Sequence, residues 1–141
     1  YVWDTLSGQV IYRFNHPSRV TMVALDPKGR YAFTADSKKS ANIWDLKTGK
    51  LVSKLNYFNR QEVFSAVQFS PDGTKLLTGA PSRKVSIWAI ATGDRLTSWR
   101  VLPRDDIRPA GAVVYSVAFR DNSQVITESS SGYAELWQVN K

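Results

Sequence analysis

Hydrophobic and polar residues alternate in short runs along the chain, and glycine or proline turns separate the runs. Three segments share one pattern: "VTMVALDPKGRYAFT" from Val20, "FSAVQFSPDGTKLLT" from Phe64 and "VYSVAFRDNSQVITE" from Val114. Each has two alternating runs around a turn, and a period of two places successive side chains on opposite faces of a strand. The pattern therefore predicts one antiparallel hairpin in each segment.

A second hairpin belongs to each copy of this unit. The segments "WDTLSGQVIYRF" from Trp3, "WDLKTGKLVSKL" from Trp44 and "WAIATGDRLTSW" from Trp88 share a tryptophan that is followed five positions later by a glycine. Trp137, in "YAELWQ", marks a further copy, and the intervals between the four tryptophans are 41, 44 and 49 residues. One unit is thus predicted to be four short antiparallel strands. The sequence as a whole predicts an all-β protein.

A repeat of about 40 to 45 residues with four strands and a Trp-Asp dipeptide is typical of a β-propeller blade. Trp44-Asp45, Ser70-Pro71-Asp72-Gly73 and the Thr-Gly turns resemble the WD-repeat (WD40) family, and the resemblance covers essentially the whole chain. It implies a buried set of hydrogen bonds in each blade, made by a tryptophan, a serine or threonine, a histidine and an aspartate.

Carried over position by position, this structural set comprises His16, Thr34 and Trp44 in the first full blade, Thr78 and Trp88 in the second, and Thr127 and Trp137 in the third. The aspartate position, taken six residues before each tryptophan, holds Lys38, Ser82 and Ser131, and the histidine position becomes Arg60 and Ala110 in the later blades. We therefore expect one blade to keep most of the set and no blade to keep all of it.

Counting strands in order divides the chain into four parts. Residues 1–18 supply the second half of one blade, residues 19–58 and 59–102 one blade each, and residues 103–141 the first three strands of another. The prediction is an incomplete ring of about three blades, whereas propellers typically close with about 4 to 8. An open arc exposes apolar faces that normally find a partner. We expect the missing blades to come from a longer version of the same chain, with Lys141 near its natural carboxyl terminus, or from a second copy.

Composition removes several classes of function. The absence of cysteine excludes disulfides, thiolate nucleophiles and cysteine-based metal centres, and the single histidine excludes a site of several histidines. No apolar run approaches the roughly 18 residues of a membrane span. No glycine pattern for nucleotides, nucleophile elbow or zinc-protease motif occurs. We expect a protein without catalytic activity, cofactor or metal.

Two local features allow both a chemical and a structural interpretation. His16 could act as a general base beside a serine, but its place just before a strand favours a structural hydrogen bond. Asp105 and Asp106 could form a pair of catalytic or metal-binding acids. Because arginines flank them in a loop, a solvated turn with ion pairs is the favoured interpretation.

An aromatic group raises the same question. Tyr57, Phe58 and Trp99 could form a binding surface, although packing between blades is favoured.

The net charge of +7, from 19 basic and 12 acidic side chains, favours acidic partners. Loops from fourth to first strands and from second to third strands emerge at one end of a propeller, here called the top face. Eight basic and four acidic residues fall there, against seven and six at the other end. The candidate binding residues on the top face are Arg19, Lys38, Lys39, Arg60, Arg83, Lys84, Arg104 and Arg108.

In the WD-repeat family the top face is commonly where partners dock. The resemblance therefore implies a non-catalytic scaffold, part of a larger propeller, that binds partner proteins through these loops. Their basic charge favours acidic or phosphorylated segments. One alternative is binding of nucleic acid or another polyanion, which a steep dependence on salt would distinguish. Another is an enzyme whose active residues lie in absent blades. The basic residues could also form only a solvated surface that keeps the protein soluble.

Overall fold

The structure is a computed structural model and describes residues 1–57, 62–104 and 111–139. In these ranges the regular elements are all β-strands. Their bounds are β1 Val2–Trp3, β2 Val10–Tyr12, β3 Val20–Leu25, β4 Tyr31–Asp36, β5 Ala41–Asp45, β6 Leu51–Lys54, β7 Ala66–Phe69, β8 Lys75–Gly79, β9 Lys84–Ala89, β10 Arg95–Arg100, β11 Val114–Phe119, β12 Gln124–Ser129 and β13 Ala134–Gln138. Nowhere in the described ranges is there a helix long and apolar enough to cross a membrane.

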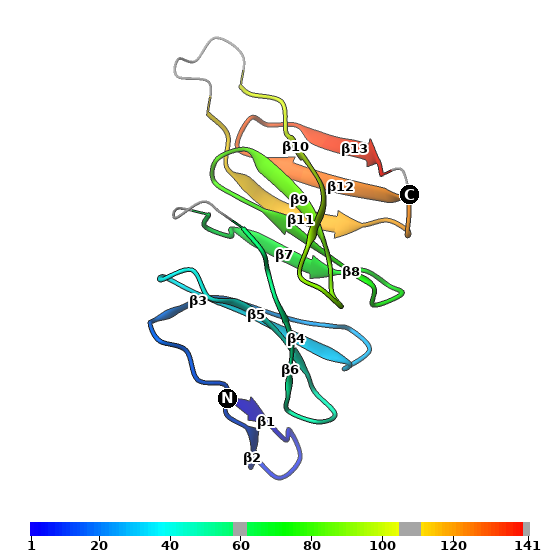
Figure 1. Cartoon of the computed structure of the whole chain (residues 1–141). Helices are drawn as coiled ribbons and strands as arrows, with labels where there is room; N and C mark the ends of the chain where they lie inside the picture. The colour runs from blue at the N-terminus through cyan, green and yellow to red at the C-terminus, as the bar shows by residue number, and fades with distance from the viewer. Residues whose placement is uncertain (58–61, 105–110, 140–141) are drawn as a thin grey trace.

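The strands form four antiparallel sheets in which neighbours in sequence are neighbours in space. β1 pairs with β2, β3–β6 and β7–β10 form four-stranded sheets, and β11–β13 form a three-stranded sheet. Figure 1 shows these sheets stacked one after another from the N-terminal to the C-terminal end. The predicted arc of four-stranded antiparallel blades, with the ring left open, is confirmed.

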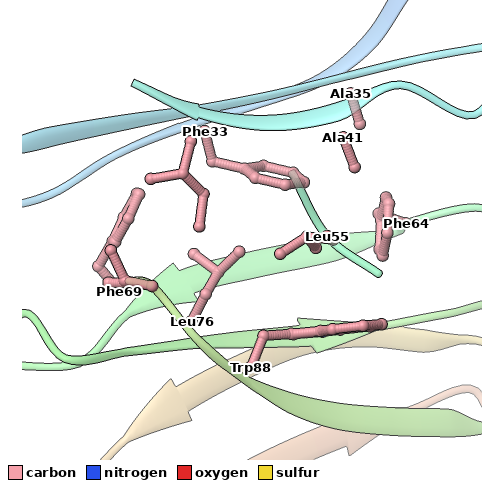
Figure 2. Close-up of a cluster of buried hydrophobic side chains, with 10 residues drawn as sticks. Phe33, Ala35, Ala41, Leu55, Phe64, Phe69, Leu76 and Trp88 are labelled. Carbon is pink, nitrogen blue, oxygen red and sulfur yellow. The ribbon is translucent and has the colours of Figure 1, made fainter. Parts of the chain in front are cut away.

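Each blade packs through alternate residues of its central strands, as the period of two requires. On β8, Leu76 belongs to the core between the β3–β6 and β7–β10 blades, whereas its neighbour Leu77 belongs to the core between β7–β10 and β11–β13. On β9, Trp88 and Ile87 divide in the same way. In the first of these cores, Phe33 of β4 packs toward the side chains of the next blade (Figure 2). Full burial of one such side chain stabilises the fold by about 1.5 to 3 kcal/mol.

Hydrogen bonds tie the blades together at the same junctions. Ser53 of β6 donates its hydroxyl to the Ile90 carbonyl of the next blade at 2.6 Å. At the second junction, the backbone N–H of Phe119 donates to Gln68 Oε1, also at 2.6 Å. Both contacts satisfy backbone polar groups that would otherwise be stranded between packed sheets.

The β9–β10 turn approaches the preceding blade very closely. Gly93 lies there at φ +76°, and a Cβ atom on it would collide with the carbonyl oxygen of Lys54. The Gly93 carbonyl in turn accepts the N–H of Asn56 at 2.8 Å. At Gly93 the recurring spacing from tryptophan to glycine therefore serves blade packing as well as the turn itself.

We predict that Gly93→Ala destabilises the protein by at least about 3 kcal/mol, because it combines a strained left-handed backbone with overpacking against Lys54. Gly29→Ala is the matched control, since Gly29 has φ +69° and open space around its Cβ position. The Gly29→Ala substitution should lower the stability by only about 1 to 2 kcal/mol. Urea unfolding of the two variants measures the difference. Equal losses would show that the contact with Lys54 has no energetic weight.

Candidate functional site

A chain of hydrogen bonds runs through the β3–β6 blade toward the top face. The indole Nε1–H of Trp44 donates to Thr34 Oγ1 at 2.8 Å, and the same oxygen lies 2.7 Å from His16 Nε2. His16 Nδ1 lies 3.1 Å from Asp36 Oδ2. The side chains of His16 and Asp36 are both buried. In neutral His16, an Nδ1–H that donates to Asp36 leaves Nε2 to accept the threonine hydroxyl, so that every group is satisfied.

This geometry corrects two expectations about the structural set. The acidic position is filled by Asp36, eight residues before Trp44, and not by Lys38. The first full blade therefore keeps all four members, whereas the sequence led us to expect that no blade did. The signal that could have identified Asp36 is its spacing from Thr34, because residues i and i+2 of a strand share a face.

Asp36 also orders the turn that displays two of the candidate cations. Its Oδ1 accepts the backbone N–H groups of Lys38 at 2.8 Å and Ser40 at 3.0 Å. Burial raises the pKa of the Asp36 carboxyl, but the hydrogen bonds from Ser40, His16 and Lys38 together outweigh it, and the pKa lies below its ordinary value. The carboxylate is thus ionised near neutral pH and fixes the backbone that carries Lys38 and Lys39.

Lys39 has an unusual backbone conformation for its residue type, with φ +78°. Arg83 occupies the same place in the β8–β9 turn, five residues before Trp88, with φ +69°. In the third blade the position is Gly132, at φ +90°. A residue other than glycine in the left-handed region costs about 1 to 2 kcal/mol. Two blades thus keep a cation where glycine would be less strained.

The second blade has a different arrangement around its tryptophan. Trp88 Nε1–H donates to Thr78 Oγ1 at 2.9 Å. The Arg95 guanidinium lies over the Trp88 ring, 4.4 Å from its centroid, and pairs with Glu62 at 2.7 Å. Glu62 also pairs with Lys84 at 3.1 Å. Lys84 is therefore part of an internal ion-pair cluster and not a free surface cation.

In the third blade, Trp137 Nε1–H donates to Thr127 Oγ1 at 3.0 Å. The Trp-to-Thr bond thus recurs in all three blades, while among the described residues histidine and aspartate join it only in the first.

The predicted basic residues of the top face fall into three groups. Arg83 is held in place, because its Nε and one Nη donate to the Val101 carbonyl at 3.0 and 2.9 Å, and Lys84 is paired as above. Four are exposed and have no described carboxylate within ion-pair distance. These four, which we call the free cations, are Arg19, Lys38, Lys39 and Arg104. Arg60 and Arg108, like Asp105 and Asp106, lie outside the described residues.

An open hollow of about 260 Å³ lies between the β3–β6 and β7–β10 blades at this face. Arg19 and Lys39 line it, together with Val63, which is 56% exposed. Its carboxylates, Asp36 and Glu62, are those already paired within the protein. The hollow therefore combines free positive charge with apolar surface. No three histidine, aspartate or glutamate side chains gather to form a metal site in the described ranges.

The aromatic residues singled out in the sequence pack between blades. Tyr57 meets Phe64 and Trp88 edge-on at ring distances of 5.9 and 6.3 Å. Burial raises the pKa of Tyr57 to about 12, so its hydroxyl is neutral. Trp99 lies 5.7 Å from Trp137. Phe58 is outside the described residues.

We predict that Thr34→Val destabilises the protein by about 2 to 4 kcal/mol, because both the Trp44 indole and His16 lose a buried partner. Thr78→Val is the matched control, since Thr78 Oγ1 serves Trp88 and makes only a long contact of 3.4 Å with the Ser86 carbonyl. The Thr78→Val variant should lose only about 1 to 2 kcal/mol of stability. Urea unfolding of both variants gives the comparison, and equal losses would contradict the role of His16.

Acid should weaken the same network. A carboxyl whose pKa is lower in the folded state stabilises the protein above its ordinary pKa, and this contribution disappears as pH falls through the folded value. We predict that Asp36→Asn lowers the stability by about 1.5 to 3 kcal/mol at about pH 5, where hydrogen bonds to the charged carboxylate are lost. Between about pH 5 and pH 3 the variant should lose less stability than the original protein. Urea midpoints at both pH values test this, and identical losses would refute it.

Comparison with known proteins places the fold. The family model of the WD domain, G-beta repeat, matches residues 8–45 and 49–89, which together exceed half of the chain. A search of curated proteins found no match.

Among solved structures, the β-propeller domain of Cps50 (Swd1) from Myceliophteria thermophila superposes with a TM-score of 0.69 and 21% identity, over 90% of this chain and 38% of that one. Hsv2 of Kluyveromyces lactis superposes with a TM-score of 0.74 and 14% identity, over 89% of this chain and 43% of that one. The computationally designed Ika4 protein superposes with a TM-score of 0.71 and 23% identity, over 98% of this chain and 78% of that one. The chain thus spans less than half of the two natural relatives, and at these identities the likeness is one of fold. The resemblance to WD repeats is confirmed: the chain belongs to the WD domain, G-beta repeat family, whose β-propellers generally act as scaffolds for protein interactions.

Proposed function

We propose that the chain is part of a non-catalytic scaffold that binds an acidic segment of a partner protein at the top face. The binding site is the hollow between the β3–β6 and β7–β10 blades. The observation that carries this proposal is the pair of free cations, Arg19 and Lys39, beside the exposed Val63 side chain. A partner segment would place carboxylates on the cations and an apolar side chain on Val63.

The electrostatics of the hollow favour an anionic ligand. Asp36 is hydrogen-bonded by His16 and by a backbone N–H group, and Glu62 is ion-paired with Lys84 and Arg95. The free cations therefore dominate the field that a ligand meets, and such fields raise the encounter rate with anions. The strained backbone of Lys39 supports the same interpretation, because strain of this kind gathers at binding sites.

Apolar surface favours a peptide over a nucleic acid. A phosphate backbone has no apolar side chain to place on Val63 and Phe64, which both line the hollow, whereas a peptide can offer a leucine or phenylalanine between acidic residues. The guanidinium of Arg83 is held by the Val101 carbonyl and the charge of Lys84 is paired with Glu62, so both are less available to a phosphate. Free positive charge is thus concentrated at a few places, which suits a short segment better than a long polyanion.

The test is selection from a displayed library of 12-residue peptides, followed by titration of the best binder. We expect enrichment of aspartate and glutamate around one apolar residue. The double variant Arg19→Ala, Lys39→Gly should weaken that binder at least about tenfold, since each lost charge-assisted hydrogen bond is worth about 1.5 to 3 kcal/mol. Glycine at position 39 keeps the turn, as Gly132 does in the third blade.

The matched control is Lys28→Ala, Lys50→Ala, which removes the same charge from the opposite face, where both lysines are exposed. The affinity of this control variant for the selected peptide should stay unchanged. A DNA duplex of 20 base pairs and a phosphorylated form of the selected peptide are titrated at two salt concentrations. Tight duplex binding that weakens steeply with salt would replace the proposal by polyanion binding. Absence of any acidic enrichment would also refute it.

A further inference from the structure

Ser37 stands beside the two free cations of the hollow. It is exposed in the turn between β4 and β5, and it lines the hollow together with Arg19 and Lys39. Its backbone N–H donates to the Arg19 carbonyl at 3.0 Å, which extends the β3–β4 pairing by one step beyond Val20 and Asp36. Cross-strand neighbours of this kind have Cβ atoms about 5 Å apart. A group attached to Ser37 Oγ therefore lies within reach of the Arg19 guanidinium.

The Ser37 hydroxyl can be modified without disturbing the buried network. It donates to Ser18 Oγ over a long 3.2 Å, and Ser18 Oγ also accepts the Lys38 N–H at 3.1 Å. The Asp36 carboxylate is held from other directions, by His16 and by the backbone of the same turn. Replacing the hydroxyl proton of Ser37 thus removes one weak bond and leaves the turn in place.

A phosphate monoester matches the charge of the hollow. It carries about −1.5 to −2 near neutral pH and has three strong acceptor oxygens. Arg19 and Lys39 together supply the compensating charge, whereas a single carboxylate would balance only one of them. Of the two carboxylates that line the hollow, Glu62 is paired with two cations of its own, and Asp36 is buried with its oxygens hydrogen-bonded. Attraction by the two free cations therefore outweighs repulsion.

Two serines of the top face share the same sequence surroundings. Ser37 is followed by two lysines, and Ser82 by an arginine and a lysine. Both serines are exposed in the turn between the second and third strands of their blades. Kinases read charge patterns of this kind around the residue that they modify. The cations after Ser82 are held by the Val101 carbonyl and by Glu62, so of the two serines it is Ser37 that stands beside free cations.

We propose that Ser37 is a phosphorylation site and that its phosphate fills the hollow by pairing with Arg19 and Lys39. A separate kinase supplies the phosphate from a nucleoside triphosphate. Ser37 Oγ attacks the γ-phosphorus, an Oγ–P bond forms, and the bond from that phosphorus to the β,γ-bridging oxygen breaks. The nucleoside diphosphate leaves, and the hydroxyl proton passes to the base of the kinase.

The consequence for binding rests on the proposed function, because the phosphate takes the two cations that an acidic partner segment would use. An anion tethered beside them has an effective concentration on the order of millimolar. Phosphorylation of Ser37 therefore switches the hollow off.

The first experiment asks whether Ser37 accepts phosphate. The purified protein is incubated with magnesium ATP and, in separate reactions, with serine kinases that select basic residues after the acceptor. Mass spectrometry then locates the modified residues. We expect phosphate on Ser37, and its loss in the Ser37→Ala variant. Absence of phosphate from Ser37 with every kinase of the set would overturn its assignment as a modification site.

The second experiment asks what the phosphate contacts. Phosphoserine is incorporated at position 37 or, as the matched control, at position 82, and each phosphate is titrated by ³¹P NMR. The second pKa of phosphoserine is about 6, and nearby cations favour the dianion. We expect this pKa to be lower at position 37 than at position 82 by at least about 0.5. The double variant Arg19→Ala, Lys39→Gly should remove the difference, and equal titration at the two positions would refute the pairing.

The third experiment measures the effect on binding. The acidic peptide selected above should bind at least about tenfold more weakly to the protein with phosphoserine at position 37, and equally well to the protein with phosphoserine at position 82. An affinity insensitive to phosphoserine at position 37 would overturn the regulation and leave the proposed function standing. If no acidic peptide is selected, the proposed function and its regulation both fail, whereas the pairing of the phosphate is decided by the ³¹P titration alone.

Discussion

Everything in this protein depends on the burial of each blade by its neighbours. Leu76 and Leu77 are consecutive residues of one strand, yet they belong to different cores because successive side chains of a strand point to opposite faces. A blade therefore cannot satisfy its own hydrophobic residues and needs a neighbour on each side. Stability in such a stack is close to a sum of nearest-neighbour interfaces, and the two open faces are where that sum is incomplete.

The same stacking connects the interior to the surface. Trp44 lies at one end of a hydrogen-bond chain through Thr34 and His16, and Asp36 lies at the other. Asp36 in turn holds the backbone of the β4–β5 turn, so the position of Lys39 is set by a buried network. Loops ordered in this way lose less entropy when a ligand binds, which would favour the proposed binding site.

Most of the fold could be predicted from the sequence, while the candidate site could be predicted only in outline. Alternation and the tryptophan-to-glycine spacing identify the strands and their order because both are local properties. Asp36 was missed because counting back from Trp44 crosses a turn, whereas counting forward along β4 from Thr34 does not. The sequence could not show which cations are free. Arg83 is bound by the Val101 carbonyl and Lys84 by Glu62, and both partners lie about 20 residues away in the chain.

The sequence by itself determined the all-β blades, their number and the family, because short-range periodicity decides strand faces and turns. Tertiary structure decided which charges remain available and which apolar residues remain exposed. Ile87 and Leu136 have the same place in the repeat, but one is buried and the other is half exposed. Their difference comes only from the presence or absence of a neighbouring blade, and no local pattern in the chain contains that information.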